Sequence, residues 1–265
     1  MESNYIAISY GQLALSALLI VVNLALSVAL RLGLAQSLLI AALRMVLQLL
    51  LIGFVLEWLF TQDNALVVVA IALVMTAIAG VSAVNRTRRR FAGIYWHSLL
   101  SVLTASALVT GFATVGIIRV QPWYDPQYLI PLLGMVLGNT LNGISLGLDR
   151  FMEGLVAQRD QVETLLALGA TRWEAAHQTV REAIRVGMIP TINSMMVMGL
   201  VSLPGMMTGQ ILAGANPIDA VRYQIVIVLM IAAGAALGIF GVVLLAYRRL
   251  LSPDHQLRLD YLVKQ

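Results

Sequence analysis

One stretch of the sequence has the form of a catalytic motif, the pentapeptide Gly143-Ile144-Ser145-Leu146-Gly147. It matches the Gly-x-Ser-x-Gly pattern in which hydrolases present a nucleophilic serine on a strained turn between a strand and a helix. Here the pentapeptide lies inside an apolar stretch that is long enough to be a membrane helix. The histidines that could serve as a base, His97, His177 and His255, lie at or beyond the expected membrane edges. We therefore expect no catalysis from this chain, and an intramembrane hydrolase is kept only as an alternative.

Polar residues also occur within the apolar stretches, where they are costly unless they pair or meet water. Arg44 and Gln48 lie one helical turn apart on one face. In one interpretation they line a polar path or make a buried bond between helices. In the other, the Arg44 side chain extends to the lipid headgroups. With later polar and irregular positions they make up the candidate translocation path. Its residues are Arg44, Gln48, Asn139, Ser202, Pro204, Gly205, Met206, Met207 and Gln210.

The stretch from about residue 188 to 213 is the least regular. Pro190 and Pro204 remove backbone donors, and broken helices at membrane depth persist only where they line protein or a water-filled cavity. Half of the twelve methionines lie here: Met188, Met195, Met196, Met198, Met206 and Met207. Thioethers suit Cu(I) better than a hard iron ion, but methionine is also an adaptable packing residue, and packing is the interpretation that we favour over metal ligation. No cluster of His, Asp or Glu has metal-ligand spacing within the apolar stretches, so metal ligands stay unassigned.

The preceding apolar stretch, residues 128–148, is rich in small residues. Gly134, Gly138, Gly143 and Gly147 would let neighbouring helices approach closely, and Asn139 or Asn142 could bond across such a contact. Helix packing is the interpretation that we favour here over contact with a substrate.

The long charge-rich interval of the chain is Arg150 to Val186. Its apolar residues fall along one helical arc up to Leu168. Gly169 suits the left-handed residue that ends a helix, and Thr171-Arg172-Trp173-Glu174 forms a capping box that begins the next one. The interval is therefore predicted to be a water-facing helix, tight turn and helix between two membrane segments.

Composition predicts an all-α integral membrane protein, because 60% of the 265 residues are hydrophobic and only 11% are charged. The expected spans are about 9–30, 37–60, 65–84, 94–118, 128–148, 188–213 and 219–247, which gives seven transmembrane helices in one domain, 1–265. Met1 to Ile8 lacks the basic residues of a signal peptide, so the first span is expected to be retained.

Charge placement orients these spans. With the N-terminus outside and the C-terminus inside, the inner side holds Arg31, the run 85–90, the interval 150–186 and Arg248-Arg249. The outer side then holds Arg119 and Arg222 with the acidic Glu57, Asp63, Asp125 and Asp219. Basic residues that flank apolar spans indicate contact with membrane lipid and not with nucleic acid.

The chain lacks the elements of a nucleotide site of its own. A P-loop needs a lysine after a glycine-rich turn, and the single lysine, Lys264, has no such turn before it. The absence of cysteine excludes disulfides and thiolate metal sites.

Two stretches carry a family resemblance. Residues 163–171, ETLLALGAT, resemble in part the cytoplasmic EAA-type loop of ABC transporter permeases, although Thr164 and Leu165 stand where that loop has two alanines. Residues 199–224, GLVSLPGMMTGQILAGANPIDAVRYQ, closely resemble the FetB-type permease family. That family comprises the membrane half of a bacterial ABC iron exporter and plant relatives linked to aluminium tolerance. The residues around Arg44 and Gln48, and the pairs Gly134-Met135 and Gly138-Asn139, also fit its pattern.

The resemblance implies a permease domain in the bacterial inner membrane that exports iron or another metal. It implies ATP hydrolysis, with ATP and magnesium, in a separate P-loop ABC ATPase, and no cofactor held by this chain. A homodimer is expected because one chain offers a single coupling hairpin, whereas ATP is sandwiched between two ATPase subunits. The residues expected to couple the ATPase are Glu163, Gly169, Ala170, Thr171 and Trp173. The alternatives are a permease for a nucleotide sugar or a metal chelate, and a membrane scaffold that transports nothing.

Overall fold

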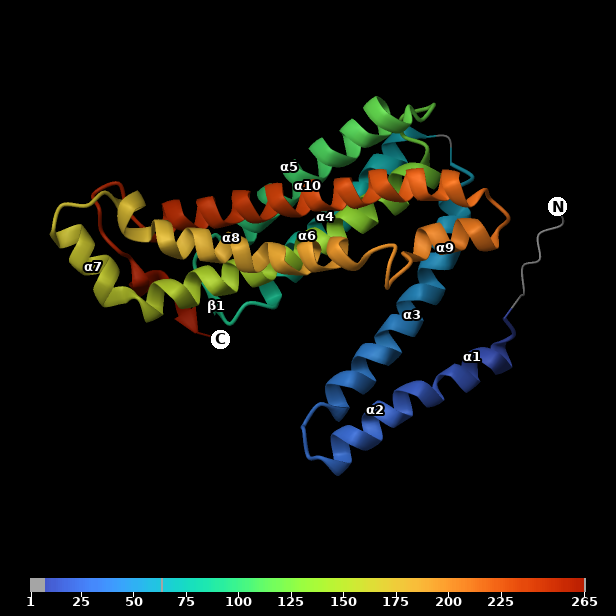
Figure 1. Cartoon of the computed structure of the whole chain (residues 1–265), viewed down its shortest axis with the longest axis horizontal. Coiled ribbons are helices and arrows are strands. Elements are labelled where there is room, and N and C mark those ends of the chain that lie inside the picture. Colours follow the sequence, from blue (N-terminus) through green and yellow to red (C-terminus); the bar gives the residue numbers. More distant parts are fainter. Residues whose placement is uncertain (1–7, 63, 265) are drawn as a thin grey trace.

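The computed structural model describes residues 8–62 and 64–264, and within these ranges the chain is largely helical (Figure 1). Residues 1–7, part of the stretch tested for a signal peptide, and the acidic Asp63 lie outside the described residues. The helices are α1 Tyr10–Ser16, α2 Leu18–Ala29, α3 Ala35–Leu59, α4 Ala65–Asn85, α5 Ile94–Gly111, α6 Pro126–Ala157, α7 Arg159–Ala167, α8 Arg172–Val197, α9 Gly205–Leu212 and α10 Pro217–Leu250. A π-helical turn at Phe112–Ile118, a 3-10 turn at Leu259–Tyr261 and the short strands β1 Arg89–Arg90 and β2 Val263–Lys264 complete the elements.

Six helical segments in the described part of the chain are long and apolar enough to cross a membrane. They are Tyr10–Ala29, Ala35–Leu59, Ala65–Asn85, Ile94–Ile118, Pro126–Ala157 and Pro217–Leu250. Each overlaps one of the spans that the sequence predicts. The remaining expected span, 188–213, is divided between α8 and α9, so length and composition alone do not identify it.

The predicted break in that span is confirmed, but only one of the two prolines takes part in it. Pro190 lies within α8 without ending it. The helix ends at Val197, Gly199 takes the left-handed φ of 83°, and Pro204 precedes the first residue of α9. Gly199 N–H donates to the Ser202 carbonyl at 2.9 Å, which closes a tight non-helical turn between the two helices.

Helix α6 is the centre of the bundle. It packs along α10 and α8 and also touches α4 and α5, so that apolar side chains such as Ile144, Leu148 and Phe151 are fully buried. In Figure 1, α7, β1 and the C-terminus gather at one end of the bundle, and α9 lies at the other. The chain runs out along α8, passes the break and returns along α10.

The bundle is closely packed where α6 crosses α8. A Cβ atom built on Gly187 of α8 would lie 2.9 Å from the Gly143 carbonyl oxygen of α6 and 3.0 Å from Cγ2 of Ile239 on α10. A Cβ atom on Gly143 would lie 2.6 Å from Cδ1 of Ile239. Only glycine permits this approach at both positions, which confirms that small residues of this stretch serve helix packing.

Helices α1, α2 and α3 form an arm that projects from the bundle (Figure 1). Helix α3 packs along α2, and its side chains are exposed or half-buried until Leu59, which is buried with Val68 and Leu129. The apolar side chains of the arm are suited to lipid or to another protein surface.

The crossing makes a stability prediction. The substitution Gly187→Ala should lower stability by about 1–3 kcal/mol, the usual range for adding a methyl group to a tightly packed site. The measurement is the midpoint of thermal unfolding in detergent. Gly138→Ala is the matched control, since a Cβ atom at Gly138 of α6 meets nothing within 4 Å. Equal midpoints for the two variants would show that the α6–α8 crossing is not close-packed.

Candidate functional site

The predicted helix–turn–helix of residues 150–186 is present, with one difference. Its first helix is divided, because α6 continues to Ala157 and α7 begins at Arg159 after a change of direction at Gln158. Gly169 has a φ of 91°, as its predicted place at the end of a helix requires. Nothing lies within 4 Å of a Cβ atom at Gly169, so backbone conformation is the constraint there. We call α7, the turn 168–171 and the first turns of α8 the hairpin.

The predicted capping box at the start of α8 is confirmed. The Thr171 hydroxyl and backbone N–H each lie 2.7 Å from Oε2 of Glu174, and the Glu174 N–H donates to the Thr171 hydroxyl at 3.3 Å. The hydrogen bond from the Thr171 hydroxyl, followed by that from its backbone N–H, holds the pKa of the Glu174 carboxyl below its ordinary value. The carboxylate is therefore ionised where it helps to begin the helix.

The tip of the hairpin presents one large apolar side chain that the sequence argument did not select. Leu168 is 79% exposed, directly before Gly169. Of the predicted coupling residues, Glu163 accepts a hydrogen bond from Arg159 Nε at 2.8 Å on the surface of α7, and Ala170 is half-buried beside the exposed Thr171. A leucine next to a helix-ending glycine is the sequence signal that could have identified it, because a solvated turn rarely needs such a residue.

Trp173, also a predicted coupling residue, is 41% exposed and contacts the bundle at the same time. Its ring makes edge-on contact with Tyr247 of α10, with 5.5 Å between ring centroids. Beside it, Arg172 N–H donates to His255 Nδ1 at 3.0 Å, and the Arg172 guanidinium donates to the Leu251 carbonyl at 3.3 Å. The start of α8, directly after the tip of the hairpin, is thus fixed to the end of α10 and to the C-terminal tail.

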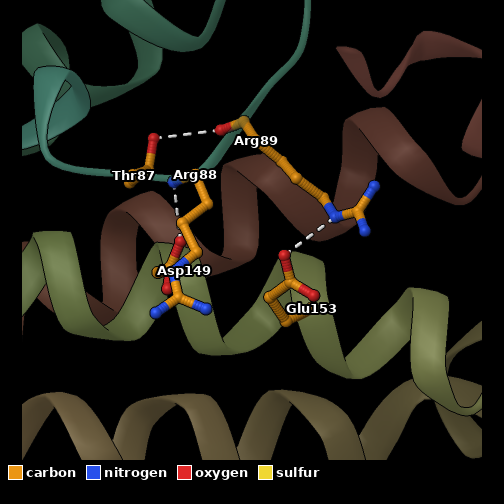
Figure 2. Close-up of polar contacts among 5 residues, drawn as sticks. All are labelled: Thr87, Arg88, Arg89, Asp149 and Glu153. Carbon is orange, nitrogen blue, oxygen red and sulfur yellow. Dashed lines mark hydrogen bonds and ion pairs between the residues drawn. The ribbon is translucent and has the colours of Figure 1, made fainter. Parts of the chain in front are cut away.

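The basic loop between α4 and α5, residues 86–90, is bound to α6 (Figure 2). Arg88 N–H donates to Asp149 Oδ1 at 2.8 Å, and Arg89 Nε forms an ion pair with Glu153 at 2.9 Å. The Arg86 guanidinium donates to Asn142, so Asn142, and not Asn139, makes the bond between helices. The expectation that this loop simply faces lipid and water is therefore incomplete, since α6 carries the matching acceptors.

A cavity of about 650 Å³ lies between α6 and α8 at this end of the bundle, and we call it the hairpin cavity. Arg150 and Glu182 approach within 3.7 Å across it, and Thr179 donates to Gln158 Oε1 at 2.9 Å. Its lining is Arg88, Leu146, Asp149, Arg150, Glu153, Gly154, Ala157, Gln158, Gln178, Thr179, Glu182 and Val186. Charged groups of both signs give it a nearly balanced electrostatic character.

A second hollow, of about 200 Å³, lies beside the break between α8 and α9, and we call it the methionine cavity. Four of the predicted path residues, Asn139, Pro204, Gly205 and Met206, are brought together in its wall. The rest of the lining is Met135, Thr191, Ser194, Met195, Met198, Gln224, Ile227, Val228 and Ile231. An adjoining hollow of about 430 Å³ shares Met195, Met198, Pro204, Gln224 and Val228 with it and adds Met207.

The other predicted path residues lie elsewhere. Ser202 is exposed in the break, and Gln210 of α9 lines neither hollow. Arg44 and Gln48 are exposed on the arm, because α3 reaches the bundle only near its C-terminal end. Neither residue lines the methionine cavity or the adjoining hollow. Gln224, which the sequence argument missed, is buried in the wall between the two hollows.

Ser145, the serine of the hydrolase-like pentapeptide, lies in the interior of α6. Its hydroxyl donates to the Ala83 carbonyl at 2.9 Å, so it serves packing between α6 and α4. Within residues 8–62 and 64–264 there is no group of three or more His, Cys, Asp or Glu side chains arranged to hold a metal ion.

Comparison with known proteins gives matches along most of the chain. The family model described as "Uncharacterised protein family (UPF0014)" matches residues 10–251. A UPF0014 membrane protein of Synechocystis sp. is 42% identical over 226 residues, which cover 85% of this chain and 87% of the relative. No solved structure matches.

Two further relatives have more specific names. "Probable iron export permease protein FetB" of Escherichia coli is 31% identical over 258 residues, covering 97% of this chain and 98% of the relative. "Protein ALUMINUM SENSITIVE 3" of Arabidopsis thaliana is 37% identical over 227 residues, covering 85% and 82%. With its long apolar helices and these matches, the chain is a multi-pass membrane protein that belongs to the UPF0014 family.

Proposed function

We propose that this chain is the membrane-spanning permease subunit of an ABC transporter that exports iron or another metal across the bacterial inner membrane. ATP and magnesium are bound and used by a separate P-loop ATPase, and this chain holds no cofactor. The name of the Escherichia coli relative, which aligns over 98% of its length, supports metal export.

The observation that carries the proposal is the construction of the hairpin. Its helices pack on the core through Val162, Ala175 and Ala176, its tip carries the exposed Leu168, and Trp173 directly after the tip contacts Tyr247 of α10. An exposed apolar side chain beside a rigid turn is suited to dock in a groove of a partner. Motion applied to the tip is passed directly to α6 and α8, because the first and last helices of the interval continue into the bundle.

The contact between Gly143 and Gly187 would act as the pivot of that motion. The hairpin cavity lies on one side of it along α6 and α8, and the methionine cavity lies on the other. A displacement of the hairpin by the ATPase would rotate α8 about this contact, so that one hollow opens as the other narrows. This is alternating access through a rigid-body movement of packed helices.

Seven crossings with the N-terminus outside and the C-terminus inside fit this scheme. The sixth of these crossings would be formed by the second half of α8, the break and α9. The basic loop and the C-terminal tail then lie with the hairpin on the cytoplasmic side, since β1 and β2 pair antiparallel through Arg89 with Lys264 and Arg90 with Val263.

The hairpin cavity favours a second candidate function, the export of a small organic solute or a metal chelate. Its volume of about 650 Å³ is in the range of small-molecule sites, and Arg88 and Arg150 in its wall could bind an anionic group.

Two copies of the permease would complete the transporter. One chain supplies one hairpin, and an ATP sandwich needs two docking points. The arm supports this, because Arg44 and Gln48 on α3 are exposed and a charge that faces lipid is costly. A second copy could supply the missing partners.

The first prediction concerns Gly169. Gly169→Val forces a β-branched residue into a left-handed conformation at a cost of roughly 1–2 kcal/mol and should tilt the tip, so stimulation of the ATPase and export should fall while membrane insertion survives. Gly169→Asn is the matched control, since asparagine tolerates this conformation. If the valine variant stimulated the ATPase as well as the wild type does, the hairpin would not be the coupling element.

The second prediction concerns assembly. Native mass spectrometry of the purified transporter should give two permease chains and two ATPase chains. A stable complex of one permease and one ATPase that hydrolyses ATP would contradict it.

The third prediction tests the function itself. Vesicles containing the permease and its ATPase should move a metal from a panel of ions in a manner that requires ATP, and should lose this activity with Gly169→Val. ATP-dependent movement of an organic solute, without movement of any metal, would favour the second candidate function.

A further inference from the structure

The methionine cavity gathers residues that are far apart in the sequence. Met135 comes from α6, Met195 from α8, Met198 from the break and Met206 from α9. Met207 lines the adjoining hollow, which is separated from the first by Met195, Met198 and Gln224. Four thioether side chains from four segments therefore surround a space of about 200 Å³.

Gln224 is the second, independent observation. It is only 7% exposed, it lines both hollows, and its Oε1 atom has no hydrogen-bond partner among the described residues. A buried amide oxygen without a partner costs free energy, so such an atom in a cavity wall indicates a missing ligand. This oxygen can accept a hydrogen bond or coordinate a cation, and it cannot donate.

The chemistry of the lining selects the ligand. None of the residues around either hollow carries a charge. A hard divalent or trivalent ion would lose its water without gaining the anionic oxygen or imidazole ligands that it prefers, whereas thioethers are soft ligands that favour Cu(I). A monovalent ion also has less charge to desolvate.

We propose that the methionine cavity is a binding site for a soft monovalent metal cation, Cu(I) or Ag(I), held by the thioethers of Met135, Met195, Met198 and Met206 with Gln224 Oε1. The assignment rests on the proposed function in one respect, in that it names the class of ion that the permease carries. Binding involves no change of oxidation state and releases no proton, because thioethers and amides bind without deprotonation.

The break gives this site a means of release. Met195 and Met198 precede Gly199, whereas Met206 and Met207 follow Pro204. A movement of α8 relative to α9 about this turn separates the two groups of sulfur atoms and lowers the number of ligands around the ion. The ion would then leave by the loss of ligands.

The test uses the full-length permease without its ATPase, in detergent, with Ag(I) as the probe because it does not change oxidation state in air. Bound silver is measured by mass spectrometry after passage over a desalting column, and affinity is measured by competition with a chelator. Wild type should retain one Ag(I) per chain. Met195→Leu should weaken binding by at least about tenfold, and Met195→Leu, Met198→Leu and Met206→Leu combined should abolish it, since leucine conserves volume and removes the sulfur.

Met196→Leu is the matched control. Met196 is the next residue of α8, is 73% exposed and lines neither hollow, so silver binding should not change. Gln224→Leu separates binding from packing: it removes an unpaired buried oxygen, so thermal stability should be kept or raised while affinity for Ag(I) falls. A purely structural glutamine would not show this opposition.

The site is refuted if the triple variant binds Ag(I) like the wild type, or if Met196→Leu weakens binding as much as Met195→Leu. These results do not depend on transport. Silver binding that is lost in the triple variant, with no ATP-dependent movement of any solute in vesicles, would uphold the site and overturn the proposed function. If ATP-dependent transport and silver binding were both unchanged in the triple variant, the site would be overturned and the proposed function would stand.

Discussion

The close approach of α6 and α8 at Gly143 and Gly187 is the contact on which the rest of the bundle depends. Ile239 of α10 lies over the same point, so three long helices meet within van der Waals distance. With the backbones this near, no cavity can persist between them at this level. The hollows are therefore confined to the two ends of the α6–α8 pair, the hairpin cavity towards α7 and the methionine cavity towards α9.

The two cavities differ in how their polar groups are satisfied. In the hairpin cavity, charged side chains of opposite sign lie near one another, and the basic loop adds the Arg89–Glu153 ion pair at its edge. In the methionine cavity, the polar groups are neutral, and Oε1 of Gln224 has no hydrogen-bond partner among the described residues. Water can enter the first at low cost, whereas the second gains most from a ligand with little charge. In the proposed transporter, this difference is suited to an ion that is hydrated in the hairpin cavity and dehydrated in the methionine cavity.

Local features of the sequence proved predictable, and long-range ones did not. The capping box at Thr171, the left-handed Gly169 and the break near Pro204 were readable because each depends on residues within a few positions of one another. The ring contact between Trp173 and Tyr247 could not be predicted, because the two residues are far apart in the chain. Pro190 shows the opposite error, since α8 continues through it although proline disfavours the interior of a helix.

The residues of the candidate site were likewise predictable only in part. Asn139 and Met206 could be selected as polar or irregular residues in apolar surroundings, and they do share a cavity. Gln224 was missed, because a glutamine near the start of a long apolar span looks like part of a solvated helix end. Arg44 was selected for its charge, but its partners are decided by how α3 packs, and no pattern within α3 specifies that the helix belongs to a projecting arm.

The C-terminal tail joins segments that the sequence keeps apart. Arg258 N–H donates to the Leu250 carbonyl at 2.8 Å, His255 accepts from Arg172 at the start of α8, and β2 pairs with β1 in the basic loop. A short segment that bonds to several elements couples their local unfolding. The end of α10, the start of α8 and the basic loop therefore form one cooperative unit of local stability. If an ATPase docks on the hairpin as proposed, its binding would therefore change the local stability of the α4–α5 loop without any direct contact with that loop.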